Sequence, residues 1–213
     1  MKTEDLITLL AAGESKVDRG IAARRYALAL GWGTCGALLL MAALLGMRAD
    51  LADAAHLTMF WVKLAYVAGL AVASLLAAAR LSRPGMPLAW TKGALAAPVL
   101  AMWLLALFVL WRADASARTA LFFGQTWTSC PLLVAMLSVP IFAAVVWAMR
   151  GLAPTRLRLA GAAAGLLSGA SGALVYCLHC PEMDAPFLGF WYLLGILIPT
   201  AFGALLGPRL LRW

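Results

Sequence analysis

Hydrophobic residues fill six long stretches of this chain, and polar residues gather in the short segments between them. Each stretch has about the 20 apolar residues that an α-helix needs to cross the hydrocarbon core of a bilayer. The stretches run from Tyr26 to Met47, Leu57 to Ala79, Thr91 to Trp111, Thr128 to Met149, Leu159 to Cys177, and Phe187 to Leu206. The pattern predicts an all-α fold in which residues 26–213 form a multi-pass bundle of six transmembrane helices.

Residues 1–25 precede the first stretch and form a separate polar tail. In this tail Leu6, Ile7 and Leu10 fall on one side of a helical wheel, and Thr3 is suited to cap the helix that they would form. A helix of this length is marginal on its own in water, so its apolar side needs a surface to cover it. The lipid headgroups and a partner protein both remain open as that surface.

The overall composition excludes a water-soluble protein. Hydrophobic residues make up 64% of the chain and charged residues 12%, whereas soluble domains carry about 25% charged residues. The mean hydropathy is +0.92. The connecting segments are too short for a soluble catalytic domain, and the charged tail lacks the apolar core of a cleaved signal peptide. We therefore expect an integral membrane protein whose first span serves as its own insertion signal.

Basic residues concentrate on one side of the predicted six-span arrangement. They lie in the tail, in the second and fourth connections and at the C-terminus: Lys2, Lys16, Arg19, Arg24, Arg25, Arg80, Arg83, Lys92, Arg150, Arg156, Arg158, Arg209 and Arg212. By the positive-inside rule this side is cytoplasmic, so both termini are predicted to lie in the cytoplasm, with the bundle in an inner membrane. The net charge of +8 thus reflects topology, and no direct binding of nucleic acid is expected.

Reactive side chains are densest where the fifth stretch ends, in the sequence Tyr-Cys-Leu-His-Cys-Pro-Glu of residues 176–182. A second Cys-Pro pair opens the fourth stretch at Cys130, on the same predicted outer side. An exposed thiol there can ionise, bind a soft metal or form a disulfide, and an imidazole is a further ligand for such metals. We predict a metal- or redox-responsive site of Cys130, Cys180 and His179. A purely structural role for the two cysteines is the alternative.

Two neighbours of this group have weaker assignments. Glu182 is placed to complete a coordination shell, and Cys177 is either a packing residue or a secondary ligand. Cys35 lies in the middle of a span, where a thiol behaves as a small hydrophobic group, and no role is expected for it. Any metal is expected to be transient and thiophilic, with no permanent cofactor.

Several other features have ordinary structural explanations. Lys63 is the single charge well inside a span, but it lies about two turns from the outer end, so its amine is expected to reach the membrane interface. Eight of the tryptophans lie mostly near span ends, as interfacial anchors do. In the fifth stretch four glycines lie on nearly one face and are expected to pack within the bundle rather than in a dimer: Gly161, Gly165, Gly169 and Gly172.

The sequence lacks a catalytic constellation, and we expect no enzymatic activity. A small metal transporter would be expected to show paired, interrupted half-helices, whereas Pro98, Pro140 and Pro199 occur singly. A membrane thiol oxidoreductase or a small metal transporter stays open as the alternative function. The oxidoreductase is favoured by Cys177 and Cys180, which have the spacing of a Cys-x-x-Cys motif.

Six stretches spread from one end of the chain to the other resemble the NrsF-type six-span anti-sigma factors of proteobacteria. They are residues 1–7, 80–85, 126–131, 147–161, 176–182 and 206–213. The resemblance implies an inner-membrane protein that holds an extracytoplasmic-function sigma factor inactive and releases it under stress, including heavy-metal stress. It also implies that the sensing cysteines are Cys130 and Cys180.

For such a protein, the sigma factor is expected to meet the cytoplasmic segments. An amphipathic helix docks its apolar side into a groove, which points to Leu6, Ile7 and Leu10. The basic fourth connection, with Arg156 and Arg158, is the other candidate contact.

Overall fold

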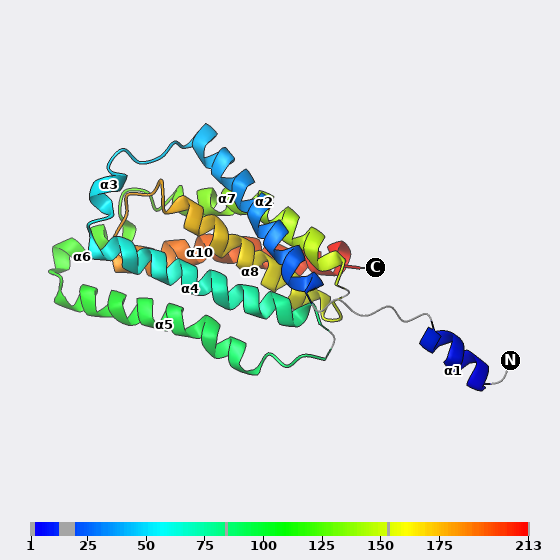
Figure 1. Ribbon diagram of the computed structural model, residues 1–213. Helices are drawn as coiled ribbons and strands as arrows, with labels where there is room; N and C mark the ends of the chain where they lie inside the picture. The colour runs from blue at the N-terminus through cyan, green and yellow to red at the C-terminus, as the bar shows by residue number, and fades with distance from the viewer. Residues whose placement is uncertain (1–2, 13–19, 84, 153, 213) are drawn as a thin grey trace.

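The computed structural model describes residues 3–12, 20–83, 85–152 and 154–212, and within these ranges every regular element is helical. The elements are α1 (Thr3–Ala12), α2 (Ile21–Leu44), α3 (Leu51–Ala54), α4 (Thr58–Leu81), α5 (Ala89–Arg112), α6 (Ala115–Phe123), α7 (Cys130–Arg150), α8 (Leu157–Tyr176), α9 (Ala185–Phe187), the π-helical turn η1 (Leu188–Tyr192) and α10 (Leu193–Leu210). Figure 1 shows α1 apart from a bundle made by the others.

Among the residues that the structure describes, six helices are long and apolar enough to cross a membrane, which confirms the predicted number. The last is the continuous run Ala185–Leu210, made of α9, η1 and α10. The first begins at Ile21, before the predicted start of the first apolar stretch at Tyr26. Hydropathy marks only the apolar part of a helix, whereas the Ala and Arg residues of residues 22–25 are good helix formers that extend α2 toward the tail.

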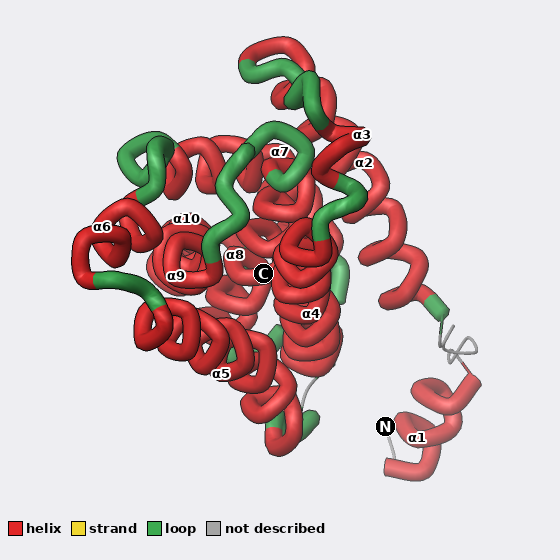
Figure 2. Tube along the Cα trace, turned by 90° about the vertical axis from the view of Figure 1, so that its left-hand side faces the viewer, coloured by secondary structure: helices red, strands yellow, loops and turns green. Residues whose placement is uncertain are grey.

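The fifth spanning helix, α8, lies at the centre of the bundle. In its most hydrophobic part 78% of α8 is buried, against 11% of α5. It packs against α10, α7, α4 and α2, whereas α5 contacts α4 and the α9–η1 region at the edge (Figure 2). A central helix must be thin, and the Gly, Ala and Ser residues of α8 make it so.

The glycines of α8 allow the closest contact in the bundle. A Cβ atom built on Gly161 would overlap the backbone of α10 at Gly203, and one on Gly165 would overlap the carbonyl of Pro199. Gly169 faces the same helix, whereas a Cβ on Gly172 would lie 3.0 Å from the backbone nitrogen of Ser138 in α7. The predicted packing within the bundle is confirmed, with the glycine face divided between two neighbours.

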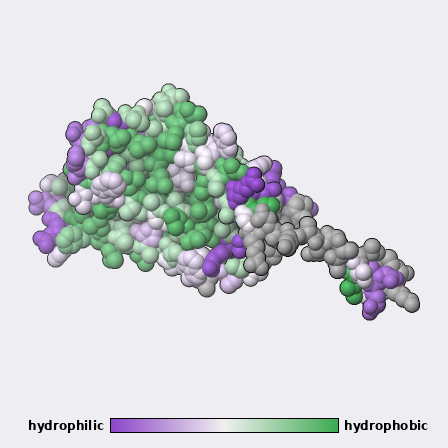
Figure 3. Space-filling model, in the orientation of Figure 1, coloured by the Kyte–Doolittle hydropathy of each residue, from purple (hydrophilic) through white to green (hydrophobic). Residues whose placement is uncertain are grey.

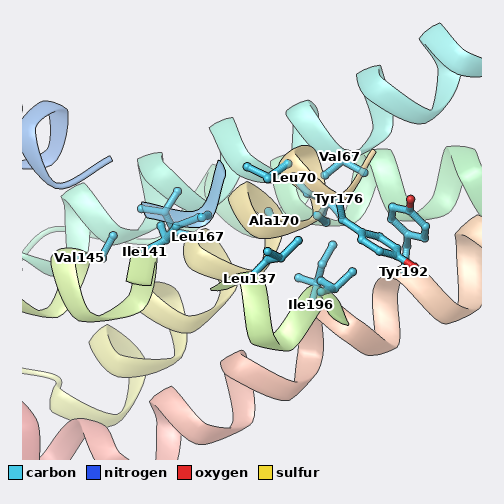
Figure 4. Close-up of a cluster of buried hydrophobic side chains, with 14 of the residues drawn as sticks. Val67, Leu70, Leu137, Ile141, Val145, Leu167, Ala170, Tyr176, Tyr192 and Ile196 are labelled. Atoms are coloured by element: carbon cyan, nitrogen blue, oxygen red, sulfur yellow. The ribbon is translucent and has the colours of Figure 1, made fainter. Parts of the chain in front are cut away.

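Figure 4 shows the core that these helices enclose, as a row of buried apolar side chains along the bundle axis. Leu137 and Ile141 of α7 meet Leu167 of α8 in its middle, and Tyr176 and Tyr192 close it at one end. On the face shown in Figure 3, hydrophobic surface covers the middle of the bundle and hydrophilic patches lie toward both ends. This distribution matches a protein surrounded by lipid.

The two ends of the bundle differ in chemistry. One end, which we name the thiol end, carries α3, α6 and the 177–184 connection (Figure 1). The other, the basic end, carries the connections α4–α5 and α7–α8 and the end of α10. The helices α3 and α6 were not foreseen, because their short sequences lack the long apolar runs that identify spans.

Candidate functional site

The 177–184 connection at the thiol end is fastened to the rest of the bundle from several directions. It follows α8 and precedes α9, so it is anchored at both ends by buried helices. Pro181 follows Cys180 and favours extended backbone before it. The connection therefore leaves helical structure, and its carbonyl groups become free to bind side chains from neighbouring segments.

The connection between α2 and α3 holds it on one side. Arg48 donates from its backbone nitrogen to the Leu178 carbonyl (3.2 Å) and from its guanidinium to the Cys180 carbonyl (3.3 Å). The Nδ1 atom of His179 lies 2.9 Å from the Gly46 carbonyl oxygen, to which it donates in the corresponding tautomer. Gly46 follows α2 at φ +74°, in the left-handed region that favours glycine at a helix end.

Glu182 holds the connection between α6 and α7. Its Oε1 accepts hydrogen bonds from the backbone of Gln125 (2.8 Å), the backbone of Thr126 (3.1 Å) and the Thr126 hydroxyl (3.2 Å). The carboxylate also fills the space where a Cβ of Gly124 would lie, and Gly124 has φ +55°. Glu182 thus links the 177–184 connection to the α6–α7 connection through hydrogen bonds. In this conformation its carboxylate has that structural role, whereas the sequence analysis placed it in a metal coordination shell.

Lys63 holds the same connection from α4, and the expectation for this residue was wrong. Its side chain is fully buried, and Nζ donates to the carbonyls of Cys180 (3.0 Å) and Glu182 (3.0 Å). Nζ also lies 5.0 Å from the centre of the Tyr192 ring, within the range of a cation–π contact. Because these partners are inside the bundle, the amine turns inward instead of toward the membrane interface.

All three cysteines of the thiol end are buried, which corrects the expectation of exposed thiols. Cys130, Cys177 and Cys180 each have no exposed surface and belong to the buried core cluster. Cys35, by contrast, is exposed on the outer face of α2, and no contact of its thiol is described. The predicted pairing in space holds, since Cys130 and Cys180 meet in one pocket although 50 positions separate them in the sequence.

The pKa values of the two thiols in the connection are shifted in opposite directions. Hydrogen bonding with Cys130, and further the charge of Lys63, lower the pKa of the Cys180 thiol, although burial acts in the other direction. Burial raises the pKa of the Cys177 thiol to about 11, so it stays protonated. Since the thiolate is the form that binds metals and reacts, the lowered pKa makes Cys180 the better candidate of the two for a ligand.

The donor set fits a soft ion bound by few ligands. Two sulfurs face each other, and thiolates are the ligands that such ions prefer. The Tyr192 hydroxyl lies beside them, buried and without a well-formed hydrogen-bond partner among the described residues. Within the described part of the chain, no three His, Cys, Asp or Glu side chains are grouped to hold a metal ion, so His179 and Glu182 are not brought into a shell with the sulfurs.

A group of aromatic rings next to this site was missed by the sequence analysis. The Trp191 ring contacts the ring of Phe122 edge-on and the rings of Phe123 and Trp127 in tilted arrangements, and its indole nitrogen donates to the Phe122 carbonyl (2.9 Å). The π-helical turn η1 places Trp191 on this side and the adjacent Tyr192 against Lys63. Single π-helical turns often occur at functional sites. Trp191 therefore makes specific contacts inside the protein, in addition to any role as an anchor at the membrane interface.

The predicted sigma-factor contacts lie in α1 and at the start of α8, away from the thiol end of the bundle. The helix α1 contains Leu6, Ile7 and Leu10; Ile7 is exposed, and the side chains of the other two lie outside the described residues. Arg156 and Arg158 are exposed at the basic end, where α8 begins. The structure thus separates the two groups of candidate residues, with α8 running from one end to the other.

Comparisons with known proteins give one consistent result. Residues 10–213 match the family described as NrsF, negative regulator of sigma F. The chain is 63% identical over 213 residues to the probable anti-sigma-F factor NrsF of Azospira oryzae and 41% identical over 218 residues to the anti-sigma-F factor NrsF of Caulobacter vibrioides. Both matches cover 100% of each chain. No solved structure matches this chain.

Proposed function

This chain belongs to the NrsF family of negative regulators of sigma F, and we propose that it is an anti-sigma factor of a bacterial inner membrane. It would hold an extracytoplasmic-function sigma factor at the cytoplasmic side and release it when thiophilic metal or oxidant reaches the thiols from the periplasm. The similarity over the whole length to two proteins named as anti-sigma factors carries this proposal. Both are named as regulators rather than enzymes.

The geometry supports a sensor that works across the membrane. The thiol site and the exposed basic residues lie at opposite ends of α8, which is buried along most of its length. A ligand shifts a conformational equilibrium only if it binds one state better than the other. Since Cys130 opens α7 and Cys180 follows α8, an ion or a disulfide that joins them would act on two helices whose other ends are joined by one connection. Arg156 ends this connection, and Arg158 lies in the first turn of α8.

Partner capture tests this proposal directly. The full-length chain, purified from membranes of cells that express its own sigma factor, is expected to retain that sigma factor and to release it after treatment with Cd²⁺. Absence of any sigma factor from the purified protein, with the protein intact in the membrane, would refute the proposed function.

The orientation in the membrane gives a separate prediction. Reporter fusions at the C-terminus and in residues 82–88 are expected to report the cytoplasm, and fusions beside Asp114 and Asp184 the periplasm. The reason is the concentration of basic residues at the basic end. Compartment-specific reporters, one active only in each compartment, make the measurement. A periplasmic C-terminus would place the thiols in the reducing cytoplasm and contradict sensing from outside.

The tail gives another prediction. Replacing Leu6 and Leu10 together by Asp is expected to release the sigma factor and raise transcription of its targets about tenfold or more without stress, because charge on the apolar side abolishes docking in a groove. Reporter transcription and membrane protein level are measured together. Thr8→Asp is the matched control, since the exposed Thr8 lies on the opposite side of α1.

Unchanged repression by the Leu6, Leu10 double variant at an unchanged protein level would move the contact away from α1. The exposed Arg156 and Arg158 are then the residues to replace. Reversal of both charges to Glu distinguishes a contact at the basic end from one in the tail.

A further inference from the structure

Lys63 is a buried amine whose two hydrogen bonds both go to the 177–184 connection at the thiol site. An ammonium group has three N–H donors. Two of them reach the carbonyls of Cys180 and Glu182, each at 3.0 Å, and the Tyr192 ring lies over the group at 5.0 Å. The one ion pair within the described residues joins Arg48 to Asp50, so no carboxylate neutralises Lys63 there.

This arrangement ties the charge of Lys63 to one conformation of the 177–184 connection. A buried charge without partners is costly, and here carbonyl oxygens of that connection supply the partners. If the connection moved away from α4, Lys63 would lose both carbonyls at once. The buried Lys63 therefore stabilises the closed connection, and the closed connection stabilises the buried Lys63.

A cation at the thiols changes this balance. Lys63 lies close enough to Cys180 for its charge to act on that sulfur, and the Arg48 guanidinium also donates to the Cys180 carbonyl. Two positive side chains thus already converge on this residue. A metal cation that binds the sulfurs of Cys130 and Cys180 displaces the thiol protons, which leave to solvent. The ion itself then lies close to the Lys63 ammonium in a buried region, where like charges repel more strongly than in water.

We propose that Lys63 is a latch, which an entering thiophilic cation displaces from the Cys180 and Glu182 carbonyls, so that occupation of the thiols and opening of the 177–184 connection become one event. Opening also frees Glu182 from the α6–α7 connection, which joins directly to Cys130 and α7. The inference rests on the proposed function. It adds Lys63 as the residue that couples metal binding at the thiols to the opening of the 177–184 connection.

Chemical labelling of the amine tests the latch in the unaltered protein. The purified full-length chain in lipid nanodiscs receives a short pulse of acetic anhydride, with and without Cd²⁺, and acetylation is measured for each lysine by mass spectrometry. Lys63 is expected to resist labelling without metal and to be labelled at least tenfold more with it. Lys92, which is exposed at the other end of the bundle, serves as the internal control and should not change.

The outcomes separate the latch from the proposed function. If the chain binds Cd²⁺, as counted by elemental analysis, and Lys63 stays unlabelled, the latch is refuted and the sensing site stands. If no Cd²⁺ is retained, metal sensing and the latch fall together. An increase in Lys63 labelling that persists in the Cys130→Ser, Cys180→Ser double variant would also refute the latch, because the cation would be acting elsewhere.

Variants of Lys63 provide a second, metal-free test. In Lys63→Met, which keeps the length without the charge, hydrogen exchange at the amides of residues 178–180 is expected to be at least tenfold faster than in the wild type. In the wild-type structure these amides donate hydrogen bonds to carbonyls at the end of α8, which protect them from exchange. Lys63→Arg keeps the charge and should exchange within about threefold of the wild type. Wild-type exchange in Lys63→Met would overturn the latch, and the labelling experiment decides the matter if that variant does not fold.

Discussion

Replacing Cys130 and Cys180 by Ser, singly or together, is expected to abolish the transcriptional response to a thiophilic metal while the protein stays folded in the membrane. Thiolates bind soft ions strongly, and a serine hydroxyl is a poor ligand for them. Moving a two-state equilibrium from one side to the other takes about 5.5 kcal/mol of differential binding. Both thiols are buried in one pocket, so the loss of either removes the ligand pair that supplies this energy.

The measurement is reporter transcription with and without Cd²⁺, beside the level of protein in the membrane. Cys177→Ser is the sharpest control, because Cys177 is equally buried in the same connection but its pKa is raised and its thiol stays protonated. Cys35→Ser is the second control, on an exposed face of α2. Both are expected to respond as the wild type does. A double variant at Cys130 and Cys180 that still responds fully would show that sensing takes place elsewhere.

Replacing Gly165 by Ala is expected to remove most of the folded protein from the membrane. The added Cβ would overlap the Pro199 carbonyl and neighbouring backbone atoms of α10, which cannot move away as a flexible side chain can. The two helices would have to separate along their length, and Gly161 and Gly169 would lose their contacts as well. We expect destabilisation of about 3 kcal/mol or more, at the upper end of the range for overpacking.

Thermal unfolding of the purified protein and its yield from membranes measure this effect. Gly31→Ala is the matched control, because Gly31 lies in a spanning helix and nothing lies within 4 Å of the position of its Cβ. That change should leave stability equal or raise it by up to about 1 kcal/mol, since Ala is the better helix former. Equal unfolding temperatures for Gly165→Ala and the wild type would mean that α8 and α10 are not in the close contact described.

Local chemistry was sufficient to locate the candidate site along the chain. The density of reactive groups in residues 176–182 and the second Cys-Pro at Cys130 identified the two segments that the fold brings together. The environment of each group was not predictable in the same way. Lys63 illustrates this, because an amine two turns inside a span can reach the interface or turn inward, and carbonyl partners from a connection more than 110 positions away decide between the two.

By itself the sequence determined the six spans, the close approach of α8 to its neighbours and the separation of basic and thiol-bearing ends. These features depend on residue type and spacing within one segment: apolar length, glycine periodicity and the distribution of Arg and Lys. Only the tertiary structure decided that the thiols are buried, that Glu182 and His179 fasten neighbouring connections, and that Lys63 faces Cys180. Each of these depends on contacts between residues far apart in the chain, and burial and hydrogen-bond partners are properties of such contacts rather than of any single segment.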